Sequence, residues 1–238
     1  VVMVATTGRS IGQVNGLAVF DLGDYSFGKP SRITASVGVG DHGVINVERE
    51  SGLSGEIHDK GIYILSGFLR NRFGQSHPLS LDASVCFEQS YGEVDGDSAS
   101  STEVYAILSA LSGLPISQEI AVTGSVNQQG DVQAIGGVNN KIEGFYDICA
   151  ARGLTGGQGV IIPKSNMEHL MLDEEVVDAV KRGKFHVWAV ANIDEGMELL
   201  TEVSAGKADT KGRYPSGTVN RLASTRLDEM ARSLRDYR

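Results

Sequence analysis

The sequence predicts an α/β protein built around a mixed β-sheet, and three observations support this fold class. In the second half of the chain, segments with apolar residues at helical spacing alternate with short apolar runs, as in crossover connections between parallel strands. Near the beginning, several strand-like segments follow one another with glycine turns between them, which favours antiparallel pairing. The 41% hydrophobic and 21% charged residues are typical of a globular protein and argue against disorder or a fibrous fold.

Each expected element follows from its local pattern. Strands are expected where short runs rich in β-branched residues end at turn-forming residues. They cover residues 14–21, 32–39, 44–48, 79–87, 119–126, 159–162 and 185–190, with a short piece near Val132 that closes a hairpin. Helices are expected where apolar residues recur every three or four positions. They cover residues 57–73, 98–112, 138–152, 174–182 and 193–200, with a shorter helical pattern at 167–170. The first helix is expected to direct Ile57, Leu65 and Leu69 to its apolar side.

We divide the chain into a body at residues 1–203, a linker at 204–217 and an amphipathic helical tail at 218–238. The linker is rich in small, polar and turn-forming residues. The net charge of −9 is uneven, because the segment from residue 207 onward carries +4 and the preceding residues carry −13. An acidic body is a poor binder of nucleic acid or anionic lipid, so neither partner is expected. We expect the basic tail helix to dock on this body or on a neighbouring subunit rather than on nucleic acid.

Several classes of protein are excluded by what the sequence lacks. No apolar run approaches the ~18–20 residues of a membrane helix, and the first residues do not resemble a signal peptide. The two cysteines, Cys86 and Cys149, exclude a disulfide framework and favour a cytoplasmic protein. There is no P-loop, no H-E-x-x-H and no cysteine-rich zinc spacing, so no cofactor or metal is expected in this chain. We interpret His58 and His186 as packing or capping residues.

The first candidate for chemistry is Ser98, at an expected junction between a strand and a helix. Asp97 and Ser98 are good helix N-cap residues, and the simplest interpretation is that they only cap the following helix. The same position also suits a nucleophile, because free backbone N–H groups at the positive end of a helix could stabilise an oxyanion. A nucleophilic serine would still need a base.

The second candidate is Lys141, near the start of the helix at 138–152. It is either a surface lysine whose stem covers apolar neighbours or an amine kept partly dry. Burial would lower the pKa of the amine, which could then take a proton from a serine hydroxyl. The preceding Gly136 and Gly137 would let the chain pass close to another element. No pattern in the residues themselves brings positions 98 and 141 together.

Several spaced segments together resemble the proteolytic domain of Lon proteases. They are DGDSAS around Ser98, AVTGSVNQQGDVQAIGGVNNKIEG around Lys141, which is 43 positions after the serine, and GVIIPKSN. DGDSAS is similar to the B-type branch, whereas A-type enzymes carry proline directly before the serine. The opening IGQVNGLAVFDLGDYSFGKPSRITA and the tail YPSGTVNRLASTRLDEMA resemble a bacterial, AAA+-linked branch. The resemblance covers essentially the whole chain and implies an α/β fold related to the second domain of ribosomal protein S5.

The resemblance assigns roles to four residues. Ser98 would be the nucleophile and Lys141 the general base of a dyad that hydrolyses peptide bonds through an acyl-enzyme. Asp95, at the family's acidic position three before the serine, would shape the site. The hydroxyl of Thr123 would hydrogen-bond the lysine amine. A-type enzymes carry histidines in the strand before the serine, but here that strand reads SVCFEQ, and whether its Glu or Gln replaces them is open.

The resemblance also implies partners. Family members couple this domain to an AAA+ ATPase module of the same polypeptide, which uses ATP and Mg²⁺ and unfolds the substrate. The full enzymes form a homo-hexameric ring, and their substrates are unfolded or damaged proteins. The chain begins at Val1 without an initiating Met, as expected of the C-terminal piece of a larger enzyme. ATP and Mg²⁺ are therefore expected in that module and not in this chain.

Two alternatives from other classes remain. GHMP-type small-molecule kinases share the broad fold and have a phosphate loop ending in SSAS, which DSASS superficially matches. Asp95 and Asp97 would then lie beside a triphosphate, where repulsion disfavours them and glycine N–H donors are wanted. The other alternative is a Lon-like module that is catalytically silent, at least until an ATPase partner arranges its loop.

Overall fold

The computed structural model describes residues 4–21, 23–24 and 26–237. Within these residues, seven strands form one sheet in the order β11-β10-β7-β2-β3-β5-β4. The strands are β2 (Gln13–Asp21), β3 (Ser26–Val39), β4 (Gly43–Asn46), β5 (Leu81–Phe87), β7 (Ile120–Val122), β10 (Gly159–Pro163) and β11 (His186–Val190). β11, β10, β7 and β2 run parallel to one another, β3 is antiparallel to β2 and β5, and β4 is parallel to β5. The predicted mixed sheet is confirmed.

Helices cover the sheet, and two pairs of very short strands lie beside it. The helices are α1 (Val47–Glu50), α2 (Glu56–Phe73), α3 (Ser100–Ser112), α4 (Val138–Arg152), α5 (Glu174–Lys181), α6 (Ile193–Thr201) and α7 (Val219–Tyr237), with a 3₁₀ turn at Lys164–His169. The short pairs are β1 (Arg9–Ser10) with β6 (Ile116–Ser117) and β8 (Ser125–Val126) with β9 (Val132–Gln133), both antiparallel. The second pair is the hairpin that the sequence predicts near Val132.

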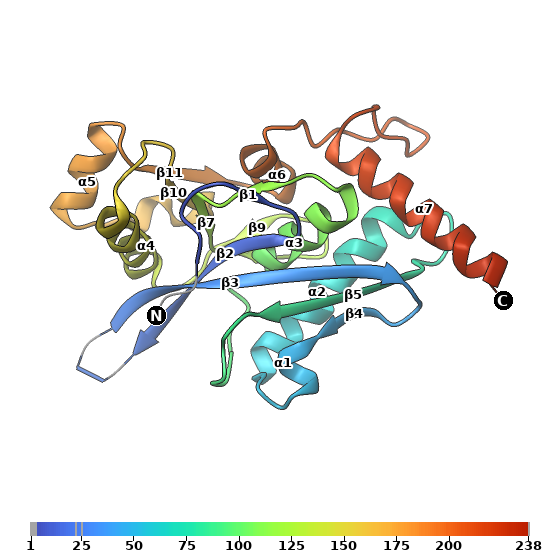
Figure 1. Cartoon of the computed structure of the whole chain (residues 1–238), viewed down its shortest axis with the longest axis horizontal. Coiled ribbons are helices and arrows are strands. Elements are labelled where there is room, and N and C mark those ends of the chain that lie inside the picture. Colours follow the sequence, from blue (N-terminus) through green and yellow to red (C-terminus); the bar gives the residue numbers. More distant parts are fainter. Residues whose placement is uncertain (1–3, 22, 25, 238) are drawn as a thin grey trace.

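Alternate residues of the strands face two separate hydrophobic cores. In β10, Ile161 belongs to one core, whereas Val160 and Ile162 belong to the other. This follows from the period of two along a strand. The first core takes side chains of α2, α3, α6 and α7, and the second takes those of α4 and α5. Figure 1 shows α4 and α5 towards one end of the molecule and α2 and α7 towards the other.

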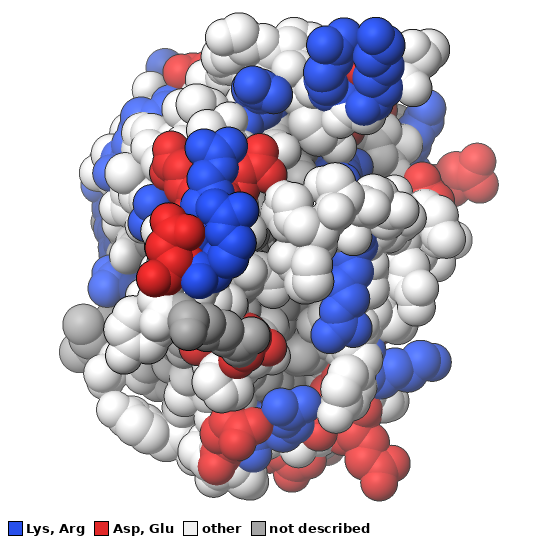
Figure 2. Space-filling model, turned by 90° about the vertical axis from the view of Figure 1, so that its right-hand side faces the viewer, with Lys and Arg blue, Asp and Glu red and all other residues white. Residues whose placement is uncertain are grey.

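Helix α7 packs against the body. Its Val219, Ala223, Leu227 and Met230 are buried in the first core, with α3 as the neighbouring helix. The expected amphipathic pattern is therefore satisfied by docking on the body. Figure 2 shows that Lys and Arg side chains are interspersed with Asp and Glu on this side of the molecule, so its basic residues do not make a surface of one sign.

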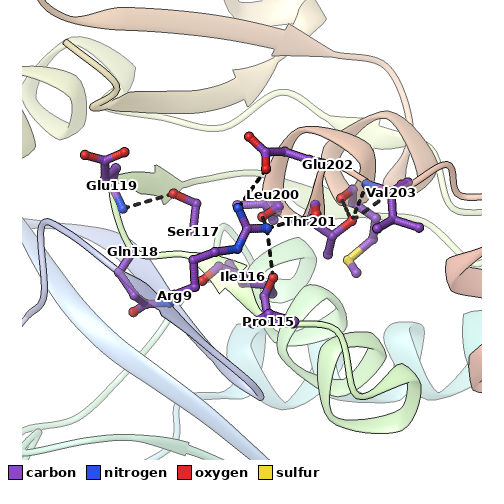
Figure 3. A network of polar contacts seen from close by, with 11 residues as sticks. Arg9, Pro115, Ile116, Ser117, Gln118, Glu119, Leu200, Thr201, Glu202 and Val203 are labelled. Carbon is purple, nitrogen blue, oxygen red and sulfur yellow. Dashed lines mark hydrogen bonds and ion pairs between the residues drawn. The ribbon is translucent and has the colours of Figure 1, made fainter. Parts of the chain in front are cut away.

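The N-terminal segment is held at the end of α6, as Figure 3 shows. The guanidinium of Arg9 donates hydrogen bonds to the carbonyl oxygens of Leu200 and Thr201, which lie in the last turn of the helix. It also donates to the carbonyl of Pro115 and pairs with Glu202 at 3.0 Å. A cation at this position satisfies unpaired carbonyls and complements the negative end of the helix dipole.

Three local expectations are wrong. Ile57 is 53% exposed instead of facing the core, because the buried side of α2 carries His58, Ile62 and Leu65. The strand expected at 119–126 is broken after β7, because the chain leaves the large sheet to form the β8–β9 hairpin. Helix α3 begins at Ser100 with Ala99 as its N-cap and no side-chain cap, so Asp97 and Ser98 do not act as caps.

Two absences apply to the part of the chain that the structure describes. No helix in it is both long and apolar enough to cross a membrane. No group of three or more His, Cys, Asp or Glu side chains in it could hold a metal ion. Cys149 is buried, as expected of a core residue, and both Cys86 and Cys149 are free thiols.

Candidate active site

Ser98 and Lys141 belong to segments on opposite faces of the sheet and meet at the end of β7. Ser98 lies in the turn before α3, and Lys141 lies in the first turn of α4. Thr123 directly follows β7, where the sheet stops and no longer separates the two faces. The structure therefore brings together three of the four residues predicted for the site.

The geometry of these three side chains is compatible with proton transfer. Lys141 Nζ lies 3.0 Å from Ser98 Oγ and 3.2 Å from Thr123 Oγ1. The Thr123 hydroxyl donates to the carbonyl oxygen of Ser98 at 3.3 Å, so its lone pairs are left to accept a hydrogen from the amine. A neutral Lys141 amine that donates to Thr123 then has its own lone pair available for the Ser98 hydroxyl.

Burial lowers the pKa of the Lys141 amine. The residue is only 3% exposed, and desolvation lowers the pKa of its amine to about 8, although the carboxylate of Asp97 acts in the opposite direction. A pKa this close to neutrality keeps an appreciable neutral fraction at physiological pH. The amine can thus accept a proton and later return it, which an ordinary surface lysine does poorly.

Two glycines let α4 lie directly on the backbone of β3 and so place Lys141. A side chain at Gly28 would overlap the carbonyl of Asn140, and one at Gly144 would overlap the carbonyl of Gly28. The neighbouring Gly137 has φ +66°, and a side chain there would also meet Val19 of β2. The close approach expected of the glycine pair at 136–137 is confirmed at Gly137.

Asp95 lies beside the serine turn but does not contact the dyad. Its carboxylate accepts hydrogen bonds from the backbone N–H groups of Ile57, His58 and Gly96. The bond from Gly96 contributes most to lowering the pKa of the carboxyl. It supplies from a distant loop the cap that Gly55, the N-cap residue of α2, cannot provide. Asp95 thus shapes the turn, and Asp97 is the acidic residue that acts electrostatically on Lys141.

The turn is also attached to the segment that follows β7. Gly124 N–H donates to the carbonyl of Ser98 at 2.8 Å, and Ser101 N–H donates back to Gly124 at 3.1 Å. Within the described residues, no acceptor takes the backbone N–H of Asp97 or Ser98. These two donors remain available at the positive end of α3, where an oxyanion could bind.

The Ser98 and Lys141 side chains open into a cleft of about 470 Å³. Sequence reasoning missed three residues that line it: Ile57, Asn166 and His169. The side-chain amide of Asn166 accepts from the N–H and donates to the carbonyl of Ile135, which holds one wall of the cleft in place. Asn166 ends the quoted segment GVIIPKSN and could have been suspected, whereas no local signal marks His169.

Glu88 and Gln89, which end the segment SVCFEQ, lie away from the cleft. The carboxylate of Glu88 accepts a hydrogen bond from the Thr34 hydroxyl at 2.6 Å. Glu88 and Gln89 border a different hollow, with Phe20 and Lys29, and neither lines the cleft at Ser98.

The site is of a recognisable chemical class. A serine hydroxyl beside a buried amine of lowered pKa, with free backbone donors next to it, is the arrangement needed for nucleophilic acyl transfer without histidine. The fold and the site together describe a mixed α/β protein with a serine–lysine pair at the end of a central strand.

Comparison with known proteins gives the family. Residues 82–202 match the Lon protease (S16) C-terminal proteolytic domain. Lon protease homologues of Escherichia coli strain K12 and Haemophilus influenzae are 47% and 49% identical over 84% of this chain. The archaeal Lon protease of Pyrococcus abyssi is 32% identical over 97% of this chain. The chain belongs to the Lon proteolytic domain family. It spans 34%, 33% and 22% of these three relatives.

Proposed function

We propose that this chain is a serine endopeptidase domain that hydrolyses peptide bonds with a Ser98–Lys141 dyad. The observation that supports this most directly is the distance of 3.0 Å between Ser98 Oγ and the buried Lys141 Nζ, at the edge of an open cleft. A hydroxyl alone is a weak nucleophile at neutral pH, and a nearby neutral amine removes that limitation.

The first half of the reaction forms an acyl-enzyme. Ser98 Oγ attacks the peptide carbonyl carbon, and its proton passes to the neutral amine of Lys141. The carbonyl oxygen becomes an oxyanion, which the N–H groups of Asp97 and Ser98 stabilise. When the C–N bond breaks, the Lys141 ammonium returns the proton to the leaving amine. Lys141 is then neutral again, and an ester joins the substrate acyl group to Ser98.

The second half releases the acid. A water molecule attacks the ester carbonyl while Lys141 accepts one of its protons, and the collapsing intermediate frees Ser98 Oγ, which takes that proton back. Thr123 orients the amine throughout, because its hydroxyl accepts one N–H of Lys141 and donates to the backbone of Ser98. Each cycle consumes one water and leaves the dyad in its starting protonation state.

We also propose that the domain works within a longer, ATP-dependent protein. The supporting observations are the family and the fact that the chain spans about a third of its bacterial relatives. An AAA+ module of the same polypeptide, with ATP and Mg²⁺, would unfold damaged proteins in the cytoplasm. A homo-hexameric ring would then deliver the extended chain to the cleft.

The test is hydrolysis of casein and of a fluorogenic peptide by the wild type, Ser98→Ala and Lys141→Ala. Matched controls are Ser165→Ala and Lys164→Ala, which remove the same groups from exposed positions just outside the cleft. We expect the two dyad variants to lose cleavage and the controls to keep it. Equal cleavage by all five proteins would rule out the dyad.

The same proteins distinguish the alternatives. Assays of the chain alone and of the longer protein with ATP and Mg²⁺ show whether the domain needs an ATPase partner. Cleavage in neither form would identify a catalytically silent module and overturn the proposed function. Transfer of phosphate from ATP to a small metabolite, unaffected by Lys141→Ala, would favour the kinase.

A further inference from the structure

A second buried polar cluster lies behind the serine turn and plays no part in the proton transfers above. It consists of His58 in α2, Glu103 in α3 and Glu48 in α1, and the three residues are 1%, 1% and 3% exposed. Nε2 of His58 lies 3.5 Å from a carboxyl oxygen of Glu103. Charged groups are rarely buried this completely without a function in the fold or at a site.

The cluster contacts the serine turn through Gly96, two residues before Ser98. The imidazole of His58 donates a hydrogen bond to the carbonyl oxygen of Gly96, while the Gly96 N–H donates to the Asp95 carboxylate. Gly96 has φ +86°, so a side chain would strain the backbone here. The carbonyl of this residue is therefore held by α2 itself, and its N–H is held by the carboxylate that caps α2.

The orientation of one peptide bond follows from this contact. A peptide unit is planar and trans, so its C=O and N–H point in opposite directions. Since the carbonyl of Gly96 points towards buried His58, the N–H of Asp97 in the same unit points away from the core. That N–H is one of the two unoccupied donors beside Ser98. Rotation of the unit would turn the donor inward and replace it with a carbonyl oxygen.

Glu103 is the group that faces Nε2 of His58. In the described residues, neither carboxyl oxygen of Glu103 has a hydrogen-bond partner, and neither does Nε2 of His58. Desolvation, with a smaller contribution from Glu48, raises the pKa of Glu103 well above its ordinary value, and desolvation lowers the pKa of His58. The raised pKa favours the protonated carboxyl, and such a carboxyl facing Nε2 would make that nitrogen the acceptor and leave the ring N–H for Gly96.

Other groups around the imidazole do not offer Nε2 a proton. Glu48 uses one carboxylate oxygen to accept the N–H of Phe87, whose ring packs edge-on against the imidazole. Glu48 and, to a smaller extent, Asp59 and Asp95 act on the His58 ring as negative charges that raise its pKa. Glu103 is the group that lies within 3.5 Å of Nε2.

We propose that His58 and Glu103 are a buried positioning pair that holds the Gly96–Asp97 peptide with its N–H directed at the oxyanion site. The hold on the peptide is a property of the fold, whereas its effect on turnover rests on the proposed peptidase function. The pair touches no substrate. It acts through the backbone of the serine turn, so disrupting the pair should lower kcat and leave KM nearly unchanged.

Four variants separate positioning from packing. His58→Leu and Glu103→Leu remove the polar contacts but fill the space, and replacing buried polar groups with apolar ones of similar size is often neutral for stability. His58→Asn retains an amide N–H for Gly96, and Glu103→Gln retains a donor for Nε2. If the cluster only packs, the leucine variants should behave like the wild type. If it positions the turn, they should fail while the Asn and Gln variants are partly rescued.

The experiment combines amide exchange with kinetics. By NMR, the amide protons of Gly96 and Ser100, which are bonded to Asp95 and to the Asp97 carbonyl, should exchange about tenfold faster or more in the leucine variants. For a fluorogenic peptide, kcat should fall ~10²–10³-fold with little change in KM, as for loss of one oxyanion donor. The Asn and Gln variants should stay within about tenfold of the wild type in both measurements.

Two outcomes would overturn the positioning pair. One is unchanged exchange at Gly96 and Ser100 in folded leucine variants. The other needs no variant: ¹⁵N shifts of the wild-type His58 ring must indicate one tautomer with Nε2 unprotonated or bridged to Glu103, and a mixture of tautomers would contradict the proposal. If the wild type cleaves nothing, the peptidase function fails, while the exchange and ring measurements still decide whether the pair holds the turn.

Discussion

The two buried polar clusters on either side of the serine turn differ in one decisive way. Lys141 and Thr123 are almost inaccessible, yet the amine meets Ser98 at the edge of an open cleft. His58 and Glu103 are equally buried but face only the interior and the backbone of Gly96. Burial shifts pKa values in both, but only the first cluster can exchange a proton with a substrate.

A shifted pKa does not by itself mark a catalytic residue. Structural networks perturb titratable groups as strongly as active sites do. Glu103 has the more extreme environment, with its pKa raised well above normal, and has no route to substrate. Lys141 has a moderate shift and a nucleophile within 3.0 Å. Proton transfer is the role proposed for Lys141, and orientation of the turn is the role proposed for His58 and Glu103.

Removing the amine of Lys141 from the open cluster should have the largest effect on activity. Lys141→Met keeps the length of the side chain but removes the amine, so Ser98 has no base. We expect kcat for a fluorogenic peptide to fall by at least ~10³-fold, a loss comparable to removing a catalytic base. Lys164→Met, at an exposed position, is the control. A residual activity above a tenth of the wild type would mean that another group is the base.

The same variant should gain stability. At neutral pH the buried Lys141 is mostly charged, and a folded-state pKa of about 8 against an ordinary value of 10.5 means that folding works against this charge. Removing it should raise the free energy of unfolding at pH 7 by about 1–3 kcal/mol, measured by urea denaturation. In the wild type, stability should rise between pH 8 and about 10.5, because the unfolded state binds more protons there. Equal pH dependence in wild type and variant would contradict this.

The pH dependence of activity should respond to substitutions in the open cluster and not to those in the buried one. Lys141 must be neutral to act as base, so kcat/KM should rise about tenfold per pH unit below its pKa and level off above about 8. Thr123→Val should change the pKa of this limb, whereas Glu103→Gln should not. A limb that disappears in His58→Asn would instead assign the base role to His58.

The smallest effect concerns the orientation of the amine. Thr123→Val is nearly isosteric and removes the hydroxyl that accepts from Lys141 Nζ and donates to the Ser98 carbonyl. Because Ser98 keeps its bond from Gly124, the turn should remain in place. We expect kcat to fall about 3–30-fold, the range of one neutral hydrogen bond of ~0.5–2 kcal/mol. Steady-state kinetics at pH 9, with Thr155→Val as an exposed control, would measure it.

Most secondary structure was predictable, and the errors have physical causes. The bounds of the helix at 138–152 were predicted correctly, because its apolar residues recur regularly and glycines stand on both sides. Ile57 fits the same periodicity but is exposed, since the first turn of α2 lies at the cleft and its interior position belongs to His58. Periodicity cannot distinguish a side chain that faces the core from one that faces a cleft. It also does not predict which way a buried histidine points.

The sequence alone determined the alternation of helices and strands and marked Ser98 and Lys141, because periodicity and short motifs are local properties. It also supplied both interpretations of each residue, cap or nucleophile and surface lysine or base. Only the tertiary structure excluded the cap and the surface lysine. The contact of Gly28 with Gly144, the burial of Lys141 and the hold of His58 on Gly96 each join residues far apart in the chain. Desolvation, which turns this lysine amine into a base, depends on neighbours that no local pattern specifies.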